Sequence, residues 1–519
     1  MREAIGEESR PLVAAGATEN VHDLPHAQTR VLNRVGSPGN GSRLSEPGAP
    51  WTGRSDTARG PVDRDWLAAT LSVLADKHKV PGAQLAVHRG GETVAVEVGE
   101  LVHGGGVPVT RETAFPIGSI SKAWTATLVM ILVADGDLEL DAPLDEHLPE
   151  LDDLCGRLTL RQLLSHTSGF ADIPELSTLS PTRYVREHCR RQDLVLAPGT
   201  GFSYSSRNYV LVGHLIETIT GMSWWEAMES ILLRPLRIDP AAIAGVAVGA
   251  PYARPIATGH SVNTTLGRTR PVQQSLAPAE APAGALAISA VDLVALGLMH
   301  VGPGFPELLP AAYAEQMRQA VPGADPFGLA DGWGSGLAVF RDGTTGWVGH
   351  DGNANGTSCY LRIDPAGGWV VALTTNASTG SSLWQDLRTE LRRANIPLGA
   401  PGDDTALQAP AEPPAEPPLE CVGSYSNGPT EWLVIAAPDG DLCLANRGEL
   451  VARLAFYDDL GFVVQDLVSG QRQHVGRFLR DSITKRVEQL QILGRIARRT
   501  SPAVPAPRSP TGSLRRIFA

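Results

Sequence analysis

Phe115-Pro116-Ile117-Gly118-Ser119-Ile120-Ser121-Lys122-Ala123-Trp124-Thr125 is the stretch that decides the fold of this 519-residue chain. The pattern predicts an extended entry, a tight turn at Gly118 and a helix that begins near Ser119. Lys122 follows three residues later and therefore shares a helix face with Ser119. A serine at a helix N-terminus, beside an amine that burial keeps neutral, has the features of an activated nucleophile. Ser-x-x-Lys alone is a weak motif, because it fixes only two positions.

Strand patterns lie on both sides of this stretch. Upstream, residues 83–88 and 93–98 are apolar runs joined by Arg89-Gly90-Gly91, which predicts a β-hairpin. Downstream, residues 359–363 and 369–374 predict a second hairpin, and the residues between the two hairpins are rich in helical patterns. We therefore expect an α+β fold, an α/β sandwich in which one antiparallel sheet is built from both ends of the domain around a helical insert.

Composition divides the chain into five segments. Residues 1–62 are polar and rich in Gly, Pro, Ser and Arg, so we expect disorder there. Residues 63–396 form the expected catalytic domain, and residues 397–418 form a stiff Pro-rich linker. In residues 419–497 short apolar runs alternate with turns, which predicts a small β-barrel. We expect residues 498–519 to be a basic disordered tail.

Charge and cysteine usage exclude several classes of protein. The net charge of −12 argues against nucleic-acid binding and against binding to an anionic membrane surface. The five cysteines show no zinc or Cys-x-x-Cys spacing, so we expect free thiols, no metal and no cofactor. The N-terminus lacks the apolar core of a secretory signal, and the longest apolar run is too short to span a bilayer. These features favour a cytoplasmic protein without a membrane span.

Two further motifs supply groups that an activated serine needs. Tyr204-Ser205-Ser206 stands before a predicted helix, and His350-Asp351-Gly352 is predicted to form a turn before a strand. Acyl transfer requires a nucleophile, a base, an acid and oxyanion donors. We assign Ser119 as the nucleophile and expect Lys122 and Tyr204 to share the proton transfers. The backbone N–H groups of Ser119 and Asn353 are the expected oxyanion donors.

Taken together, these motifs resemble a known family. Residues 115–126, 158–169 (ending in His-Thr-Ser-Gly), 202–221 and 349–376 are similar in order and separation to the motifs of class C β-lactamases, penicillin-binding proteins of the DD-peptidase type and related esterases. The resemblance covers roughly residues 63–395. It implies the β-lactamase/DD-peptidase-like fold, an active-site serine, and catalytic roles for Ser119, Lys122, Tyr204 and His350. Stand-alone peptide cyclases and amide synthases of the penicillin-binding-protein type also carry a small C-terminal barrel. The resemblance to them implies a lipocalin-like barrel at residues 419–497.

The chain departs from the family pattern at two positions. The third motif usually opens with Lys-Thr-Gly, and here it is His350-Asp351-Gly352. A histidine at this position resembles the esterase, D-aminopeptidase and cyclase branches, where it can orient a carboxylate or donate to Tyr204. The second motif ends in Ser206 instead of Asn, so it offers a short hydroxyl in place of an amide. Both departures argue against efficient β-lactam hydrolysis. Ser206, Asp351, Gly352 and Asn353 are the expected substrate and oxyanion residues.

His166 and Ser168 raise the alternative of a Ser–His pair. Their position in His166-Thr167-Ser168-Gly169, directly after a short predicted helix, favours a role in shaping a turn. Cys359 follows the third motif among apolar neighbours, which predicts a buried strand residue and not a nucleophile.

Three functions remain open from the sequence. The first is a serine acyltransferase of an antibiotic-type natural-product pathway: a transacylase, amide synthase or peptide cyclase that moves an acyl group from an ester or thioester donor to an amine. The second is a hydrolase of the same family (esterase, D-aminopeptidase, DD-carboxypeptidase or weak β-lactamase), with water as the acceptor. The third is a non-catalytic binding protein on this fold, against which the intact Ser119, Lys122 and Tyr204 weigh.

Overall fold

A computed structural model describes residues 62–172, 179–239, 241–243, 254–342, 345–399, 402, 418–446, 449–467, 470 and 472–501. The expected disordered segment 1–62 (apart from Val62), most of the linker 397–418, and the end of the tail therefore lie outside the described residues. Within the described part of the chain, every helix is too short or too polar to cross a bilayer.

A seven-stranded antiparallel sheet forms the centre of the first domain, in the order β2-β1-β11-β10-β9-β8-β7. Its two ends in sequence meet at the β1–β11 pair, where Ala83 lies opposite Thr375. The predicted sheet built from both ends is confirmed. Its strands are β1 Gly82–Arg89, β2 Glu92–Gly99, β7 Gly332–Trp333, β8 Ala338–Asp342, β9 Thr345–Ala354, β10 Thr357–Asp364 and β11 Trp369–Thr375.

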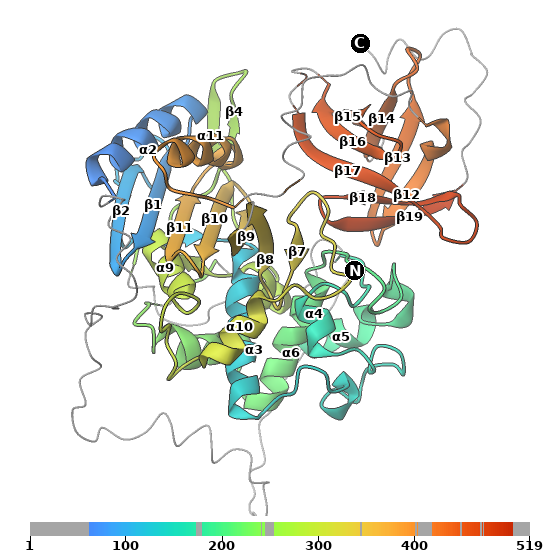
Figure 1. Ribbon diagram of the computed structural model, residues 1–519, viewed down its shortest axis with the longest axis horizontal. Helices are drawn as coiled ribbons and strands as arrows, with labels where there is room; N and C mark the ends of the chain where they lie inside the picture. Colours follow the sequence, from blue (N-terminus) through green and yellow to red (C-terminus); the bar gives the residue numbers. More distant parts are fainter. Residues whose placement is uncertain are drawn as a thin grey trace, which may run out of the picture. The chain divides into compact units, whose positions relative to one another are not determined.

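Helices cover both faces of this sheet, because its central strands are apolar on both sides. Leu85 and Leu373 face α2 (Arg64–His78) and α11 (Gly380–Arg393) in one core. Ala86 and Ala372 face the opposite core, which contains α9 (Ala290–Leu298) and α3 (Ile120–Asp135). Figure 1 shows the sheet between these two helical layers. The predicted α/β sandwich is confirmed.

The helical insert lies between β2 and β7 in sequence, and α3 runs through its centre. Thirteen of the sixteen residues of α3 are buried, so this helix has no solvent face and positions its N-terminus rigidly. Around it are the α-helices α4 Leu160–Leu164, α5 Pro181–His188, α6 Arg207–Thr220, α7 Trp224–Ala227, α8 Ala281–Gly284 and α10 Ala311–Arg318, together with two short strand pairs, β3 (Phe115–Pro116) with β6 (Ala287–Ile288) and β4 (His260–Asn263) with β5 (Arg268–Pro271). The short helix α4 begins with a capping box between Thr159 and Gln162.

The C-terminal domain is a closed eight-stranded barrel, as predicted. Aromatic side chains fill its interior: Phe462 and Phe478 lie 5.3 Å apart between ring centroids, and Tyr425 lies 5.6 Å from Phe478. Its last strand extends through Ser501, past the expected barrel end at residue 497, because residues 495–498 pair with β18 and residues 498–501 pair with β12. The strands are β12 Gly423–Asn427, β13 Thr430–Ala436, β14 Leu442–Asn446, β15 Glu449–Phe456, β16 Gly461–Asp466, β17 Arg472–Arg480, β18 Val487–Ile492 and β19 Arg495–Ser501.

The third motif is not a turn, which corrects the sequence prediction. His350, Asp351 and Gly352 lie within β9 and pair with β10, and the turn follows at Asn355-Gly356. The glycine has a packing role: a Cβ on Gly352 would lie 1.9 Å from the carbonyl oxygen of Ile117. Glycine in a strand can mark a close approach of two backbones, and a turn signal looks the same in sequence.

Candidate active site

Ser119 is the N-cap of α3 and follows a turn in which Gly118 has φ 51°. This left-handed conformation suits glycine. A Cβ on Gly118 would also lie 2.3 Å from the carbonyl oxygen of Asn353, so the turn is pressed against the end of β9. The close contact brings the backbone of Asn353 beside Ser119, where both predicted oxyanion donors belong.

Lys122 lies one helical turn from Ser119, and its Nζ is 3.2 Å from Ser119 Oγ. The amine also donates to the carbonyl oxygen of Ala283 at 2.9 Å. Only 1% of Lys122 is exposed. Burial, with the positive charge of Arg495, lowers the pKa of Lys122 to about 7 against the opposing charges of Asp172 and Glu280. A large fraction of the amine is therefore neutral near pH 7 and able to accept a proton.

Tyr204 lies beside both groups. The Lys122 amine is 5.1 Å from the centroid of its ring, and burial raises the pKa of Tyr204 although the neighbouring Ser119 hydroxyl opposes the shift. Its hydroxyl makes no hydrogen bond to the described residues. A phenol with a raised pKa keeps its proton, so this arrangement suits Tyr204 as a proton donor and Lys122 as the base.

His350 is 2% exposed, and its ring lies 6.4 Å from that of Tyr204. Burial and the nearby Lys122 lower the pKa of His350 to about 4, so the imidazole is neutral near pH 7. Nδ1 lies 2.6 Å from the carbonyl oxygen of Asp351, which can only accept, so Nδ1 carries the proton. Nε2 therefore has a free lone pair and no partner among the described residues. In this state His350 can accept a hydrogen bond but cannot donate one from Nε2.

The remaining predicted residues divide into two groups. Ser206 and Asn353 line the pocket beside Ser119. Gly352 forms the close contact with Ile117. Asp351 forms an ion pair with the buried Arg362, and the guanidinium of Arg362 stacks 3.9 Å from the centroid of the Phe340 ring. The geometry gives Asp351 a partner that anchors β9, and its backbone carbonyl fixes the His350 tautomer.

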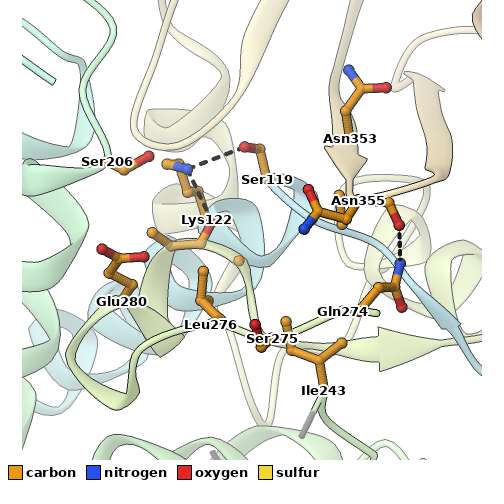
Figure 2. A pocket seen from close by; sticks show the side chains of 14 residues that line it. Ser119, Lys122, Ser206, Ile243, Gln274, Ser275, Leu276, Glu280, Asn353 and Asn355 are labelled. Atoms are coloured by element: carbon orange, nitrogen blue, oxygen red, sulfur yellow. Dashed lines mark hydrogen bonds between the residues drawn. The ribbon is translucent and has the colours of Figure 1, made fainter. Parts of the chain in front are cut away.

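A cavity of about 240 Å³ opens in front of Ser119. Figure 2 shows the Ser119 hydroxyl turned toward Lys122, with Glu280 and Ser206 on one side and Asn353 and Asn355 on the other. Glu280 is 7% exposed, and its Oε1 has no hydrogen-bond partner among the described residues. Burial raises the pKa of Glu280 to about 7, and the charge of Asp172 adds to the effect. Sequence reasoning missed Glu280, since a single acid among Pro and Ala residues carries no motif.

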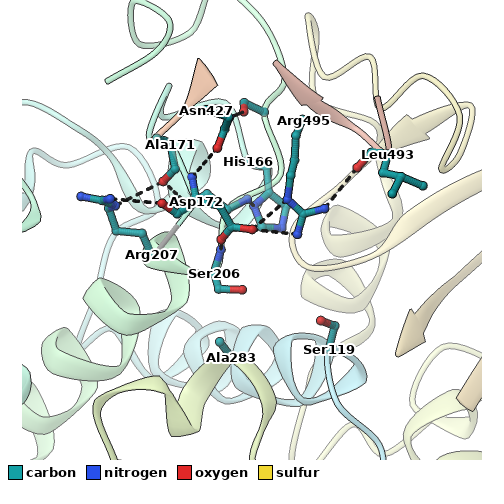
Figure 3. Close-up of polar contacts among 12 residues, drawn as sticks. Ser119, His166, Ala171, Asp172, Ser206, Arg207, Ala283, Asn427, Leu493 and Arg495 are labelled. Atoms are coloured by element: carbon teal, nitrogen blue, oxygen red, sulfur yellow. Dashed lines mark hydrogen bonds and ion pairs between the residues drawn. The ribbon is translucent and has the colours of Figure 1, made fainter. Parts of the chain in front are cut away.

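The barrel also contributes to the site. Arg495 of β19 forms an ion pair with Asp172 (Nη2–Oδ2 2.7 Å), and its guanidinium lies 5.0 Å from the centroid of the Tyr204 ring. Asp172 Oδ1 in turn accepts the backbone N–H of Ser206 at 2.8 Å. Figure 3 shows Asp172 between Ser206 and Arg495. Burial opposes ionisation of Asp172, yet Arg495 and the Ser206 N–H hold its pKa below the ordinary value. Neither Asp172 nor Arg495 stands in a recognisable motif.

Comparison with known proteins agrees with this geometry. The family model described as Beta-lactamase matches residues 67–395. The chain belongs to the beta-lactamase family. Its serine, lysine, tyrosine and histidine motifs all lie within the matched residues, so the enzyme family indicated by the sequence is confirmed.

Individual members of the beta-lactamase family cover different shares of the chain. Penicillin-binding protein 4 of Amycolatopsis lactamdurans is 34% identical over 385 residues, 70% of this chain and 98% of that protein. Esterase EstB of Burkholderia gladioli is 29% identical over 369 residues, 61% of this chain and 92% of the esterase. The crystal structure of SurE is 39% identical with a TM-score of 0.74 and covers 84% of this chain and 98% of SurE. A structure of SurE with D-Leu matches with a TM-score of 0.72 at 39% identity, over 84% of this chain and 99% of SurE.

Proposed function

We propose that this protein is a serine acyltransferase that forms amide bonds: a transacylase, amide synthase or peptide cyclase acting on an ester or thioester donor within a natural-product pathway. The observation that carries the proposal is Glu280, a buried carboxylate with an unpartnered oxygen in the cavity that Ser119 faces. A buried carboxylate oxygen that no hydrogen bond among the described residues satisfies is costly to keep unless a ligand satisfies it. An amine acceptor supplies the missing charge as an ammonium ion and the missing donors as N–H groups.

The first half of the reaction uses the groups around Ser119. Ser119 Oγ attacks the carbonyl carbon of the donor while its proton passes to neutral Lys122, and negative charge collects on the carbonyl oxygen. The backbone N–H groups of Ser119 and Asn353 stabilise that oxyanion, and each such donor typically contributes about 2.7–4 kcal/mol to lowering the barrier. The bond to the leaving alcohol or thiol then breaks, and the leaving group receives a proton from the Tyr204 hydroxyl.

The second half returns the enzyme to its starting state. An acceptor amine attacks the Ser119 ester, and its excess proton passes to the Tyr204 phenolate, which restores the phenol. The Lys122 ammonium returns its proton to the departing Ser119 oxygen, and an amide is released. Ionised Glu280 binds the acceptor as an ammonium ion, and the amine becomes nucleophilic after it gives up one proton to the solvent. His350 Nε2 is an acceptor that can orient the Tyr204 hydroxyl during these transfers.

The comparisons support an amino-acid-derived substrate. Two of the similar solved structures are of SurE, one of them with D-Leu. We therefore expect a D-amino-acid residue at the donor carbonyl or as part of the acceptor. Hydrolysis is the second candidate, since the same acyl-enzyme reacts with water and Esterase EstB is a relative. A weak activity toward β-lactams is compatible with either candidate.

Product analysis with a peptidyl thioester, with and without an added amine, tests the proposal. We expect amide product to exceed free acid when the amine is present. Glu280→Gln keeps the shape of the side chain and removes its charge, so we expect the amide-to-acid ratio to fall about tenfold, the loss of roughly one charged contact, while thioester consumption without amine stays within about twofold. Free acid alone in all conditions would overturn the transferase and leave the hydrolase.

Labelling with a fluorophosphonate and intact-protein mass measurement tests the enzyme assignment itself. The wild type should gain one label, and Ser119→Ala should gain none. A wild type that stays unlabelled, with no activity on any ester, would support the non-catalytic binding protein.

A further inference from the structure

His166 receives hydrogen bonds from both residues that flank Tyr204. The Ser203 N–H donates to the carbonyl oxygen of His166 at 3.0 Å, and the Ser205 N–H donates to its Nδ1 at 3.2 Å. The N–H of Tyr204 itself donates to the carbonyl oxygen of Gly494 in the barrel at 2.9 Å. Three successive amides therefore have defined acceptors, and His166 supplies two of them.

A side-chain relay fixes the tautomer of His166. The amide Nδ2 of Asn208 lies 3.2 Å from His166 Nδ1, and Asn208 Oδ1 accepts the hydroxyl of Ser168 at 2.6 Å. Ser168 thereby orients the Asn208 amide so that its N–H groups face His166. With two donors directed at it, Nδ1 is unprotonated, and Nε2 carries the proton.

The surroundings of His166 keep the ring neutral and close to Tyr204. The side chain is fully buried, and its ring lies 4.3 Å from that of Tyr204 at an angle of 30°. The cationic or titratable groups that face it are Lys122 of α3, His350 of β9 and Arg495 of β19, and these with burial lower the pKa of His166 well below its ordinary value. The backbone of His166 has φ 57°, a left-handed conformation that is uncommon outside glycine but that histidine, asparagine and aspartate adopt more often than other residues.

We propose that His166 is a positioning residue of the acyl-transfer site: its carbonyl oxygen and Nδ1 hold the backbone on both sides of Tyr204, and its ring holds the phenol beside Ser119. The proposal rests on the proposed function, in which Tyr204 handles the proton. It replaces the expectation that His166-Thr167-Ser168-Gly169 only shapes a turn. His166 does not act on the substrate itself, because its Nδ1 is occupied by Ser205 and Asn208 and its Nε2 is buried away from solvent.

Two substitutions separate the acceptor from the rest of the side chain. His166→Asn places Oδ1 near the position of Nδ1 and tolerates the left-handed backbone. His166→Gly also tolerates that backbone but has no acceptor, and both variants lose the ring. The difference between the two variants therefore reports on the hydrogen bond to Ser205.

Steady-state kinetics with an ester substrate, with thermal unfolding to verify folding, gives the test. We expect His166→Asn to keep kcat within about tenfold of the wild type. His166→Gly should lose about a hundredfold in kcat with KM within about twofold, the effect of a misplaced catalytic group. Equal kcat values for the two folded variants would overturn the proposal while leaving the proposed function intact, whereas a wild type that is not acylated at Ser119 would overturn both.

A second measurement needs no variant. Nitrogen NMR of histidine-labelled wild type, with the His166 ring assigned through its contact with the Tyr204 ring, should show that His166 is protonated at Nε2 only and does not titrate between pH 5 and 8. A proton on Nδ1 of His166 would overturn the proposal even if the variants fail to fold.

Discussion

Arg495 and Asp172 stand 323 residues apart in the sequence, and their guanidinium and carboxylate groups lie within 2.8 Å of each other beside the ring of Tyr204. The other oxygen of the Asp172 carboxylate accepts a hydrogen bond from the Ser206 N–H. A side chain of the barrel therefore holds the second motif in place through Asp172. The barrel therefore contributes a side chain to the candidate site, and we expect a change of charge at Arg495 to shift the pKa of Lys122.

Replacing Arg495 by Met should shift the pH dependence of acylation. The positive charge of Arg495 lowers the pKa of Lys122, so its removal should raise that pKa and move the acid limb of kcat/KM to higher pH. Arg495→Lys should preserve most of the charge effect. Arg480→Met is the matched control on the barrel. Arg480 forms ion pairs with Glu420 and Asp459, and these three residues are not among the charges that shift the pKa of Lys122. An unshifted profile in Arg495→Met would contradict the electrostatic role.

Gly352→Ala should reduce kcat by about 10²–10³, the usual effect of losing one oxyanion donor. The new Cβ would lie 1.9 Å from the carbonyl oxygen of Ile117, so β9 must move away from the Ser119 turn and take the Asn353 N–H with it. Gly346→Ala on the same strand is the control, because a Cβ there meets nothing within 4 Å. Steady-state kinetics and circular dichroism of both variants decide the matter; equal activity would mean that the close contact is not needed for catalysis.

Ser206→Asn should improve recognition of donors that carry an amide next to the reacting carbonyl. The Ser206 hydroxyl makes no cap hydrogen bond and faces the pocket, so an Asn amide there can reach the substrate. One added hydrogen bond contributes about 1 kcal/mol, which corresponds to a roughly fivefold lower KM. Donors without that amide serve as the control, and an equal gain for both kinds of donor would argue against a specific contact.

Glu280→Gln should stabilise the protein at pH 8 and have little effect on stability near pH 4.5. Burial raises the pKa of Glu280 from 4.5 to about 7, so the folded state disfavours the ionised form. The resulting penalty is absent below the unfolded pKa, grows as pH rises toward 7, and is constant above that. Melting temperatures of both proteins across this range provide the measurement. A gain that is independent of pH would show that the carboxylate charge is not its cause.

Much of the fold could be predicted from local patterns. The hairpins at either end, the long buried helix after Ser119 and the alternating runs of the barrel each follow from residue spacing over a few positions. His350-Asp351-Gly352 was predicted wrongly as a turn, because Gly352 is required by a contact with Ile117 that is distant in sequence. The extension of β19 to Ser501 was missed for a similar reason, since a basic strand is recognised only by its neighbours β12 and β18.

The sequence by itself predicted that Ser119, Lys122 and Tyr204 lie together, because Ser119 and Lys122 are linked by one helical turn and Tyr204 precedes a helix with a recognisable motif. Only the tertiary structure decided the state and the setting of those groups. Burial and charges from other elements bring the pKa of Lys122 near 7. The fold also sets the tautomer of His350, in which Nε2 is the acceptor, and leaves Oε1 of Glu280 without a partner among the described residues. Burial and Coulomb interactions act through space, so Asp172, Arg495 and His166 become part of the site only when the chain is folded.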